Sequence, residues 1–247
     1  MSTVKYYDWS FHQARTRPNK VAVKEVSSGR ETTYGQLEER SCRLASWLQN
    51  KGVKKGDRVA ILIHNCTEVF ELEFACAKIG AIELPLNWRL TKPELEYILN
   101  DSSPEVLIYG SNFVDIAESL LKDCSIKNSL EIDDEDQSNE YEQALKKNID
   151  FDVVETTHDD LIMLMYTSGT TGHPKGAMIT HEMQFYNIVN LAGSSRVTDK
   201  TVQLIVLPLF HTGGMNCYAN PILHYGCLLY TSPSPRDRTR SRMPSSA

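Results

Sequence analysis

The sequence predicts an α/β fold, a mostly parallel sheet with helices on both faces. The first observation is that short apolar strands alternate with helical patterns along most of the chain, which is typical of βαβ units. The second is an ordinary globular composition: 247 residues, 41% hydrophobic and 23% charged, long enough for a sizeable core. The third is a loop rich in glycine and hydroxyl groups that follows an apolar strand, Leu161–Met165.

The first predicted elements are a hairpin and a helix. Residues 21–26 and 31–33 flank a Gly-containing turn, which predicts an antiparallel pair. Thr33 and Gln36 have the spacing of a capping box, and Gly52 is placed to end a helix that runs to about Asn50. The residues expected to be buried at helical spacing are Leu37, Leu44, Trp47 and Leu48.

A repeated strand–helix alternation follows. The expected strands are residues 58–63, 81–84, 104–109 and 129–132, and the expected helices are residues 67–79, 91–100, 112–123 and 140–147. Thr91 and Glu94 again have capping-box spacing. Beyond the glycine-rich loop we expect a return strand at 177–180, a helix at 181–192 and a further strand at 202–209.

The glycine-rich loop is Tyr166-Thr-Ser-Gly-Thr-Thr-Gly-His-Pro-Lys-Gly176. Its glycines let the backbone approach a ligand closely, and successive backbone N–H groups in such a loop form a nest for anions. Hydroxyl groups add donors, and a lysine adds a compact positive charge. This combination predicts a polyphosphate ligand. The residues that would hold it are Thr167, Ser168, Gly169, Thr170, Thr171, Gly172, Lys175 and Gly176.

The spacing differs from the phosphate loop of kinases and GTPases, which is G-x-x-x-x-G-K-[ST]. Here Pro174 precedes Lys175 in place of glycine, and neither Ser nor Thr follows the lysine. A phosphotransferase that uses this loop as a kinase would is therefore disfavoured.

The loop resembles the phosphate-binding signature of the adenylate-forming enzymes, which include acyl-CoA synthetases, firefly-luciferase-like enzymes and adenylation domains of peptide synthetases. It matches their pattern Y-T-S-G-T-T-G-x-P-K-G at each fixed position. A second segment, Leu207-Pro-Leu-Phe-His-Thr-Gly-Gly-Met-Asn216, is also similar to the family, and a looser likeness extends from about Tyr34 to Gly226. The resemblance implies a partial N-terminal AMP-binding domain, closest to fatty-acid and other acyl-CoA synthetases.

The resemblance also implies a two-step reaction. A carboxylic acid, expected to be a fatty acid, attacks the α-phosphate of ATP to give an acyl-adenylate and pyrophosphate, and coenzyme A then takes the acyl group. Donors along the loop would stabilise the charge on the leaving pyrophosphate. Mg²⁺ is expected on phosphate oxygens, with Thr167 as its ligand from this chain. Lys175 is expected to contact phosphate rather than to act as an acid or base.

The second segment places His211 in a tight bend. Pro208 precedes it and paired glycines follow, an arrangement that presents a side chain into a cleft. In the family a residue at this position lines the acyl pocket and helps to gate access for the thiol. The resemblance therefore makes His211 a catalytic candidate beside Lys175, with Gly213, Gly214 and Met215 shaping the acyl site. The alternative interpretation is a packed loop histidine.

The last residues have a different predicted origin. Cys227–Asp237 back-translates readily into the mosaic end and read primer of a transposon-based sequencing library, and Ser241–Ala247 into the flow-cell end of the same adapter. Two adapter pieces in frame and in order favour this origin over a disordered Ser/Pro/Arg tail. We therefore expect residues 1–226 to be the domain and residues 227–247 to lie outside it.

Composition limits the classes of partner and the cellular location that we expect. The formal net charge is −6, and removing the four arginines and one aspartate of residues 227–247 makes it −9. A nucleic-acid partner needs a basic face, so this net negative charge disfavours a nucleic-acid partner.

The cysteines and the hydropathy pattern bear on the cellular location. Six cysteines without a C-x-x-C pair fit a reducing cytosol. The start has no apolar signal core, and no apolar run approaches the length of a membrane span. We expect a cytoplasmic protein.

Several segments that the family uses are not found in this chain: a Tyr-Gly-x-Thr-Glu segment with a Mg²⁺-binding glutamate, a Thr-Gly-Asp segment that binds ribose, and a C-terminal catalytic lysine. We therefore expect the chain itself to be inactive and its parent gene to encode an active ligase. Two alternatives stay open: an amino-acid-activating adenylation domain, and a non-catalytic, truncated nucleotide-binding protein.

Overall fold

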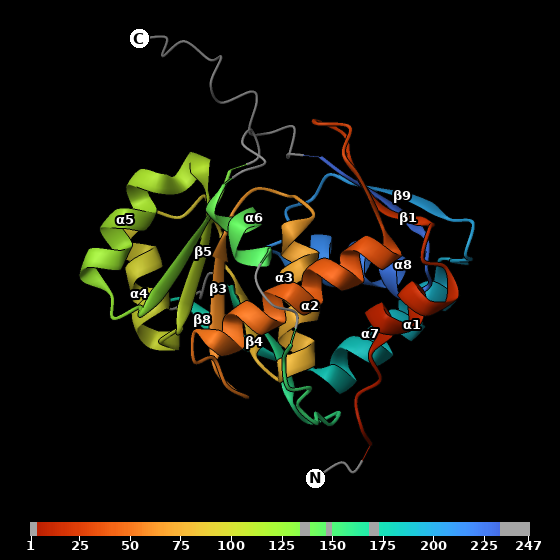
Figure 1. Ribbon diagram of the computed structural model, residues 1–247, viewed down its shortest axis with the longest axis horizontal. Helices are drawn as coiled ribbons and strands as arrows, with labels where there is room; N and C mark the ends of the chain where they lie inside the picture. Colours follow the sequence, from red (N-terminus) through yellow and green to blue (C-terminus); the bar gives the residue numbers. More distant parts are fainter. Residues whose placement is uncertain (1–3, 134–138, 147–149, 168–172, 233–247) are drawn as a thin grey trace.

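The computed structural model describes residues 4–133, 139–146, 150–167 and 173–232. Over these residues the strands form one sheet of six strands and one of four, and helices pack against both (Figure 1). The predicted α/β class is confirmed, whereas the second sheet was not predicted. Among the described residues, none of the helices combines the length and the apolar character that crossing a bilayer requires.

The six-stranded sheet has the order β6-β5-β3-β4-β7-β8. Its strands are β3 (Arg58–Leu62), β4 (Ile82–Pro85), β5 (Val106–Gly110), β6 (Asn128–Ile132), β7 (Leu161–Thr167) and β8 (Lys175–Thr180). Neighbouring strands are parallel except β7 and β8, which are antiparallel. A parallel pair needs a long crossover, whereas an antiparallel pair needs only a loop. The chain therefore reverses its direction between β7 and β8 through a loop.

The six-stranded sheet is covered on both faces because its central strand is apolar on both. Val59 and Ile61 of β3 belong to one buried cluster, and Ala60 and Leu62 belong to another, as expected when successive side chains alternate between faces. Figure 1 shows helices on either side of this sheet. The helices that contribute to the first cluster are α2 (Tyr34–Asn50) and α3 (Glu68–Ile79), and those that contribute to the second are α4 (Lys92–Ser102) and α5 (Val114–Asp123).

The predicted N-terminal capping boxes of helices α2 and α4 are confirmed. The Gln36 N–H donates to Thr33 Oγ1 at 3.2 Å, and the Thr33 N–H donates to Gln36 Oε1 at 2.9 Å. Thr91 and Glu94 form the same capping box at α4. Gly80 ends α3 in the left-handed region, with φ of 69°, a conformation that costs glycine little.

The four-stranded sheet joins segments from opposite ends of the chain, in the order β2-β1-β10-β9. Its strands are β1 (Val21–Glu25), β2 (Glu31–Thr33), β9 (Val202–Ile205) and β10 (Leu228–Thr231). The β1–β2 hairpin was predicted. The parallel pairing of β1 with β10 was not predicted. The reason is that β10 lies within residues 227–247, which we expected to lie outside the domain. A central parallel strand requires only a short apolar run, so the strand is compatible with either origin, and the origin of residues 227–247 stays a prediction.

Three helical segments were not predicted: α1 (Trp9–Thr16), η2 (Gly213–Ala219) and α8 (Asn220–His224). The first is short and begins at Asp8, whose carboxylate accepts a hydrogen bond from the Phe11 N–H at 3.0 Å. The second is π-helical, so its wider turn does not follow the 3.6-residue period that sequence patterns report. The predicted helix after β8 is confirmed as α7 (His181–Ser194).

Glu83 and Glu73 are two of the carboxylic acids that are buried in the core. Glu83 of β4 is 0% exposed, and neither of its carboxylate oxygens has a hydrogen-bond partner among the described residues. Glu73 of α3 accepts hydrogen bonds from Gln184 Nε2 at 2.6 Å and from Asn220 Nδ2 at 2.9 Å. Burial raises the pKa of Glu73 to about 7, and burial together with the nearby Glu73 raises the pKa of Glu83 well above its usual range. Both acids therefore hold protons at pH values where exposed carboxyl groups are ionised.

The buried acids predict that folding stability falls as the pH rises through about 7, because the folded state keeps protons that the unfolded state has already released. We expect Glu83→Leu to raise the free energy of unfolding at pH 8 by about 1–3 kcal/mol, and by less at pH 5. Urea unfolding at both pH values measures this difference. Glu68→Leu is the control, since Glu68 is also buried but pairs with Arg30 at 2.6 Å and its loss should destabilise. A Glu83→Leu chain that is less stable than the original at pH 8 would contradict the expectation.

Candidate functional site

A cavity of about 560 Å³ lies at the carboxyl edge of the six-stranded sheet. Its wall includes Pro85 and Thr167, which are the last residues of β4 and β7. Open α/β sheets bind ligands in crevices outside the carboxyl ends of their strands. Phe210 and His211 also line this cavity, so the structure brings the second predicted segment to the base of the glycine-rich loop.

The glycine-rich loop connects two antiparallel strands. Thr167, at the end of β7, pairs with Lys175, at the start of β8. Directly paired residues point to the same face, with Cβ atoms about 4.5–5.5 Å apart, so the hydroxyl and the ammonium side chains begin next to each other. Lys175 is exposed. The predicted phosphate-binding residues Ser168, Gly169, Thr170, Thr171 and Gly172 lie outside the described residues, and their contacts stay predictions.

Gly176 has a packing reason to be glycine. It lies opposite Tyr166, and a Cβ atom there would come within 2.9 Å of Leu164 Cδ1 and 3.3 Å of the Tyr166 ring. The Tyr166 hydroxyl donates to the Asp101 carboxylate, which ties the end of β7 to α4. Burial, and then Asp101, raise the pKa of Tyr166 above its ordinary value. Tyr166 therefore stays a neutral hydrogen-bond donor at this edge.

Tyr97, His173 and Phe210 give the cavity wall aromatic side chains. The ring of His173 stacks on that of Tyr97 in α4, with 4.7 Å between centroids and 18° between planes. The Phe210 ring packs edge-on against Trp88 at 5.8 Å, and the Arg89 guanidinium lies 4.4 Å from the Trp88 centroid and 5.5 Å from that of Phe210. His173 is exposed. Its partner could not be read from the sequence, because a stacking pair between a loop and a distant helix leaves no local pattern.

His211 is exposed at the cavity and is oriented by its own segment. The Gly213 N–H donates to His211 Nδ1 at 3.0 Å, and the His211 N–H donates to the Pro208 carbonyl at 3.2 Å. A ring nitrogen that accepts a hydrogen bond carries no proton, so the neutral ring holds its proton on Nε2. The imidazole can therefore offer Nε2–H as a donor, and its exposure disfavours the alternative of a packed loop histidine.

The residues that follow His211 shape the bend rather than the cavity wall. A Cβ atom on Gly214 would lie 2.2 Å from the Pro208 carbonyl oxygen, so only glycine fits there. Met215 is 0% exposed and packs in the larger core cluster. In the described part of the chain, Gly213, Gly214 and Met215 are not among the residues that line the cavity. Their predicted contact with an acyl group stays a prediction.

The close approach at Gly214 predicts a selective loss of stability. Gly214→Ala is expected to lower the free energy of unfolding by about 1–3 kcal/mol or more, because the bend at Pro208 must open to admit the methyl group. Gly193→Ala is the matched control, since a Cβ atom at that position meets nothing within 4 Å among the described residues. Thermal unfolding of both variants measures the difference, and equal melting temperatures would contradict the geometry of the bend.

The described residues offer little for a metal ion on their own. Over them, no group of three or more His, Cys, Asp and Glu side chains is arranged to hold a metal. Thr167 fits Mg²⁺ as a neutral oxygen ligand. Glu94, a carboxylate in the cavity wall, accepts hydrogen bonds from the Thr91 N–H at 2.8 Å and from its hydroxyl at 2.6 Å. Thr167 would therefore hold Mg²⁺ together with phosphate oxygens and not as part of a protein cage.

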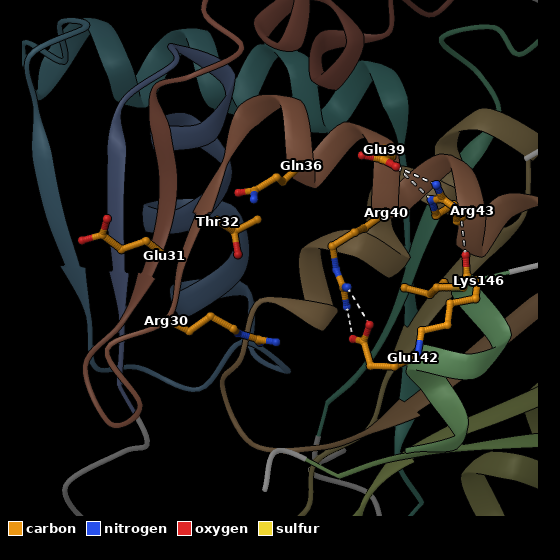
Figure 2. Close-up of a pocket in the computed structure, with 10 residues that line it drawn as sticks. Arg30, Glu31, Thr32, Gln36, Glu39, Arg40, Arg43, Glu142 and Lys146 are labelled. Carbon is orange, nitrogen blue, oxygen red and sulfur yellow. Dashed lines mark hydrogen bonds and ion pairs between the residues drawn. The ribbon is translucent and has the colours of Figure 1, made fainter. Parts of the chain in front are cut away.

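A second cavity, of about 440 Å³, is lined by residues of α2, β2 and α6 (Glu140–Leu145). In Figure 2 the Arg40 side chain points toward Glu142 and the Arg43 side chain toward Glu39, whereas Glu31 points away from them. The ion pairs around it are Arg30–Glu68 (2.6 Å), Arg40–Glu142 (2.6 Å) and Arg43–Glu39 (2.7 Å). Because these guanidinium groups already have carboxylate partners, the cavity is better explained as a stabilising network than as an anion site.

The network predicts a large effect for one arginine and a small effect for its neighbour. Arg40→Leu is expected to lower the free energy of unfolding by about 3–5 kcal/mol, because Glu71, which is 0% exposed, loses a guanidinium partner at 2.5 Å. Arg43→Leu breaks a more exposed pair on the same helix and should cost less than about 1 kcal/mol. Urea unfolding of both variants measures the two losses of unfolding free energy. Equal losses in Arg40→Leu and Arg43→Leu would contradict the prediction.

Comparison with known proteins gives consistent matches. The chain matches the AMP-binding enzyme family over residues 10–244. It is 34% identical over 218 residues to the feruloyl-CoA synthase of Amycolatopsis sp, and 34% identical over 213 residues to the long-chain-fatty-acid–CoA ligase FadD13 of Mycobacterium tuberculosis. Among solved structures, the inhibitor-bound N-terminal domain of FACL13 from Mycobacterium tuberculosis matches with a TM-score of 0.82 at 31% identity. ATP-bound MatB from Rhodopseudomonas palustris matches with 0.81 at 26%.

The matches cover most of this chain but only part of each relative. They include 88% and 86% of this chain, and 42% of the feruloyl-CoA synthase and of the long-chain-fatty-acid–CoA ligase. The two structural matches cover 92% and 95% of this chain, and 56% and 47% of those chains. The chain therefore spans less than half the length of these two curated relatives.

Proposed function

Because this chain belongs to the AMP-binding enzyme family, we propose that its parent protein is an acid–CoA ligase that activates a carboxylic acid with ATP. The acid would become an acyl-adenylate and then the thioester of coenzyme A. One observation carries the proposal: Thr167, paired with Lys175 at the base of the glycine-rich loop, lines the same cavity as His211. The relatives support it, since their names describe feruloyl-CoA, long-chain-fatty-acid–CoA and indoleacetate–CoA formation.

The proposed substrate is a hydrophobic acid, with a fatty acid preferred. Leu86, Leu90, Ile98 and Phe210 give the cavity an apolar wall, and each methylene group buried there contributes about 0.8 kcal/mol to binding. We place the reaction in the cytoplasm, because all six cysteines are free, as a reducing compartment would keep them.

In the first step a carboxylate oxygen of the acid forms a bond to the α-phosphorus of ATP, and the bond from that phosphorus to the pyrophosphate oxygen breaks. Lys175 and the loop donors would neutralise the charge that builds on the leaving pyrophosphate. Thr167 would hold Mg²⁺, which when bound shields the phosphate charges that repel the carboxylate. Two reactants held at one sheet edge also need less entropy loss to reach the reacting geometry.

In the second step the thiol of coenzyme A, as its thiolate, attacks the acyl carbon and AMP leaves with the bonding electron pair. His211 would donate from Nε2 to an oxygen of the acyl-adenylate, since its Nδ1 is occupied by the Gly213 N–H. A donor fixed before the reaction stabilises developing oxyanion charge without reorganisation. This role requires the imidazole to keep the orientation that its own segment sets.

Acid-dependent exchange of pyrophosphate into ATP by the purified full-length parent tests the proposal. We expect exchange only when a fatty acid is present, and thioester formation when coenzyme A is added. Lys175→Ala should lower kcat/KM for exchange by about 10²–10³. Lys127→Ala is the control, because Lys127 pairs with Glu105 at 2.7 Å at the amino edge of the same sheet and should leave exchange unchanged. Exchange that needs no acid, or phosphoryl transfer to an alcohol, would overturn the ligase assignment.

A further inference from the structure

The segment that carries His211 runs directly into η2, a π-helix over Gly213–Ala219. π-helical turns are rare and often lie at functional sites. Their backbone geometry is less favourable than that of an α-helix, so neighbouring groups must hold them. Gly214 explains how the chain bends toward Pro208 but not what fixes η2 to the rest of the molecule.

Asn216, in the middle of η2, is 5% exposed and uses both ends of its side-chain amide. Its Nδ2 donates to Thr212 Oγ1 at 3.3 Å and lies 3.6 Å from Met165 Sδ. Its Oδ1 accepts from Asn220 Nδ2 at 3.3 Å. Thr212 follows His211, and Met165 lies in β7 just before Tyr166 and Thr167. One buried side chain thus touches both segments of the candidate site.

The hydrogen bonds of Asn216 continue into three helices. Asn220 Nδ2 in α8 also donates to Glu73 Oε1 in α3 at 2.9 Å, and Gln184 Nε2 in α7 donates to the same oxygen at 2.6 Å. Asn187, also in α7, donates to the backbone carbonyl of Asn216 at 2.7 Å. Glu73 is 3% exposed and accepts two of these hydrogen bonds. It is therefore the buried residue at which this series of hydrogen bonds ends.

We propose that Asn216 is a positioning residue that fixes the His211 segment against strand β7, with Glu73 as the buried anchor of its hydrogen bonds. The proposal rests on the proposed function, which gives His211 and Thr167 a shared substrate. Asn216 is not part of the described cavity wall, so it acts through the placement of those two residues. Catalysis depends sharply on such placement, since a shift of about 1 Å costs about a hundredfold in rate.

Amide hydrogen exchange, measured by NMR on this chain, tests the proposal without substrate. The Gly213 N–H donates to His211 Nδ1, and the Met215 N–H donates to the His211 carbonyl at 3.0 Å, so both amides report on the His211 segment. Asn216→Ala is expected to speed the exchange of these two amides about tenfold, the equivalent of one hydrogen bond. Exchange of the Ile61 amide in β3 should not change, because it reports on opening of the whole fold.

Two further variants separate positioning from general stability. Glu73→Gln keeps a carbonyl oxygen for the two amide donors and should leave Gly213 exchange unchanged, whereas Glu73→Ala should reproduce the Asn216→Ala result. Thr212→Val removes a single acceptor at nearly constant volume, so it remains informative if Asn216→Ala does not fold.

The proposal is overturned if Asn216→Ala speeds amide exchange at Gly213 and at Ile61 by the same factor. It is also overturned if neither Asn216→Ala nor Thr212→Val changes the ratio of the Gly213 exchange rate to the Ile61 exchange rate. A failure here leaves acid-dependent pyrophosphate exchange by the parent protein untouched. A failure of that assay leaves the hydrogen-exchange result intact, so the two proposals fail separately.

Discussion

The pairing of β7 with two different neighbours is the constraint on which the candidate site depends. On one side β7 pairs in parallel with β4, and on the other it pairs in antiparallel fashion with β8. The parallel pair brings the carboxyl ends of two strands to one edge, and the antiparallel pair returns the chain at that same edge. The position of Thr167 opposite Lys175 follows from this register. A slip of one residue would turn each side chain of β8 to the other face.

Charge pairing distinguishes the cavity at the sheet edge from the cavity of Figure 2 more than the two cavity volumes do. In the cavity of Figure 2, Arg30, Arg40 and Arg43 are held by carboxylates that the fold itself supplies. At the sheet edge, Lys175 and His211 remain exposed beside a loop of glycines and hydroxyl groups. Polyphosphate brings the negative charge that such an edge can accept, whereas it would have to displace existing ion pairs in the other cavity. Exposed donors at the sheet edge, and not cavity size, therefore favour that edge as the binding site.

Elements decided by local energetics could be predicted from the sequence. The capping box of Thr33 and Gln36 and the left-handed Gly80 depend on a few adjacent residues, and the apolar run of β3 marks a strand buried on both faces. Thr167 and His211 line one cavity, and the roles that the family resemblance implies for them stay predictions. The rest depends on distant partners. The parallel pairing of β1 with β10, the stacking of His173 on Tyr97 and the π-helical turn at Asn216 leave no periodic signal in the sequence.

We propose that the β7–β8 hairpin binds polyphosphate, and an NMR titration of this chain with ATP and Mg²⁺ tests this proposal. We expect saturable shifts of the Thr167, Lys175 and His211 amide resonances. AMP, which lacks the β- and γ-phosphates, should produce smaller shifts, and Arg30 and Arg40 should not respond. Shifts centred on Arg30 and Arg40, with none at Thr167 or Lys175, would contradict the claim.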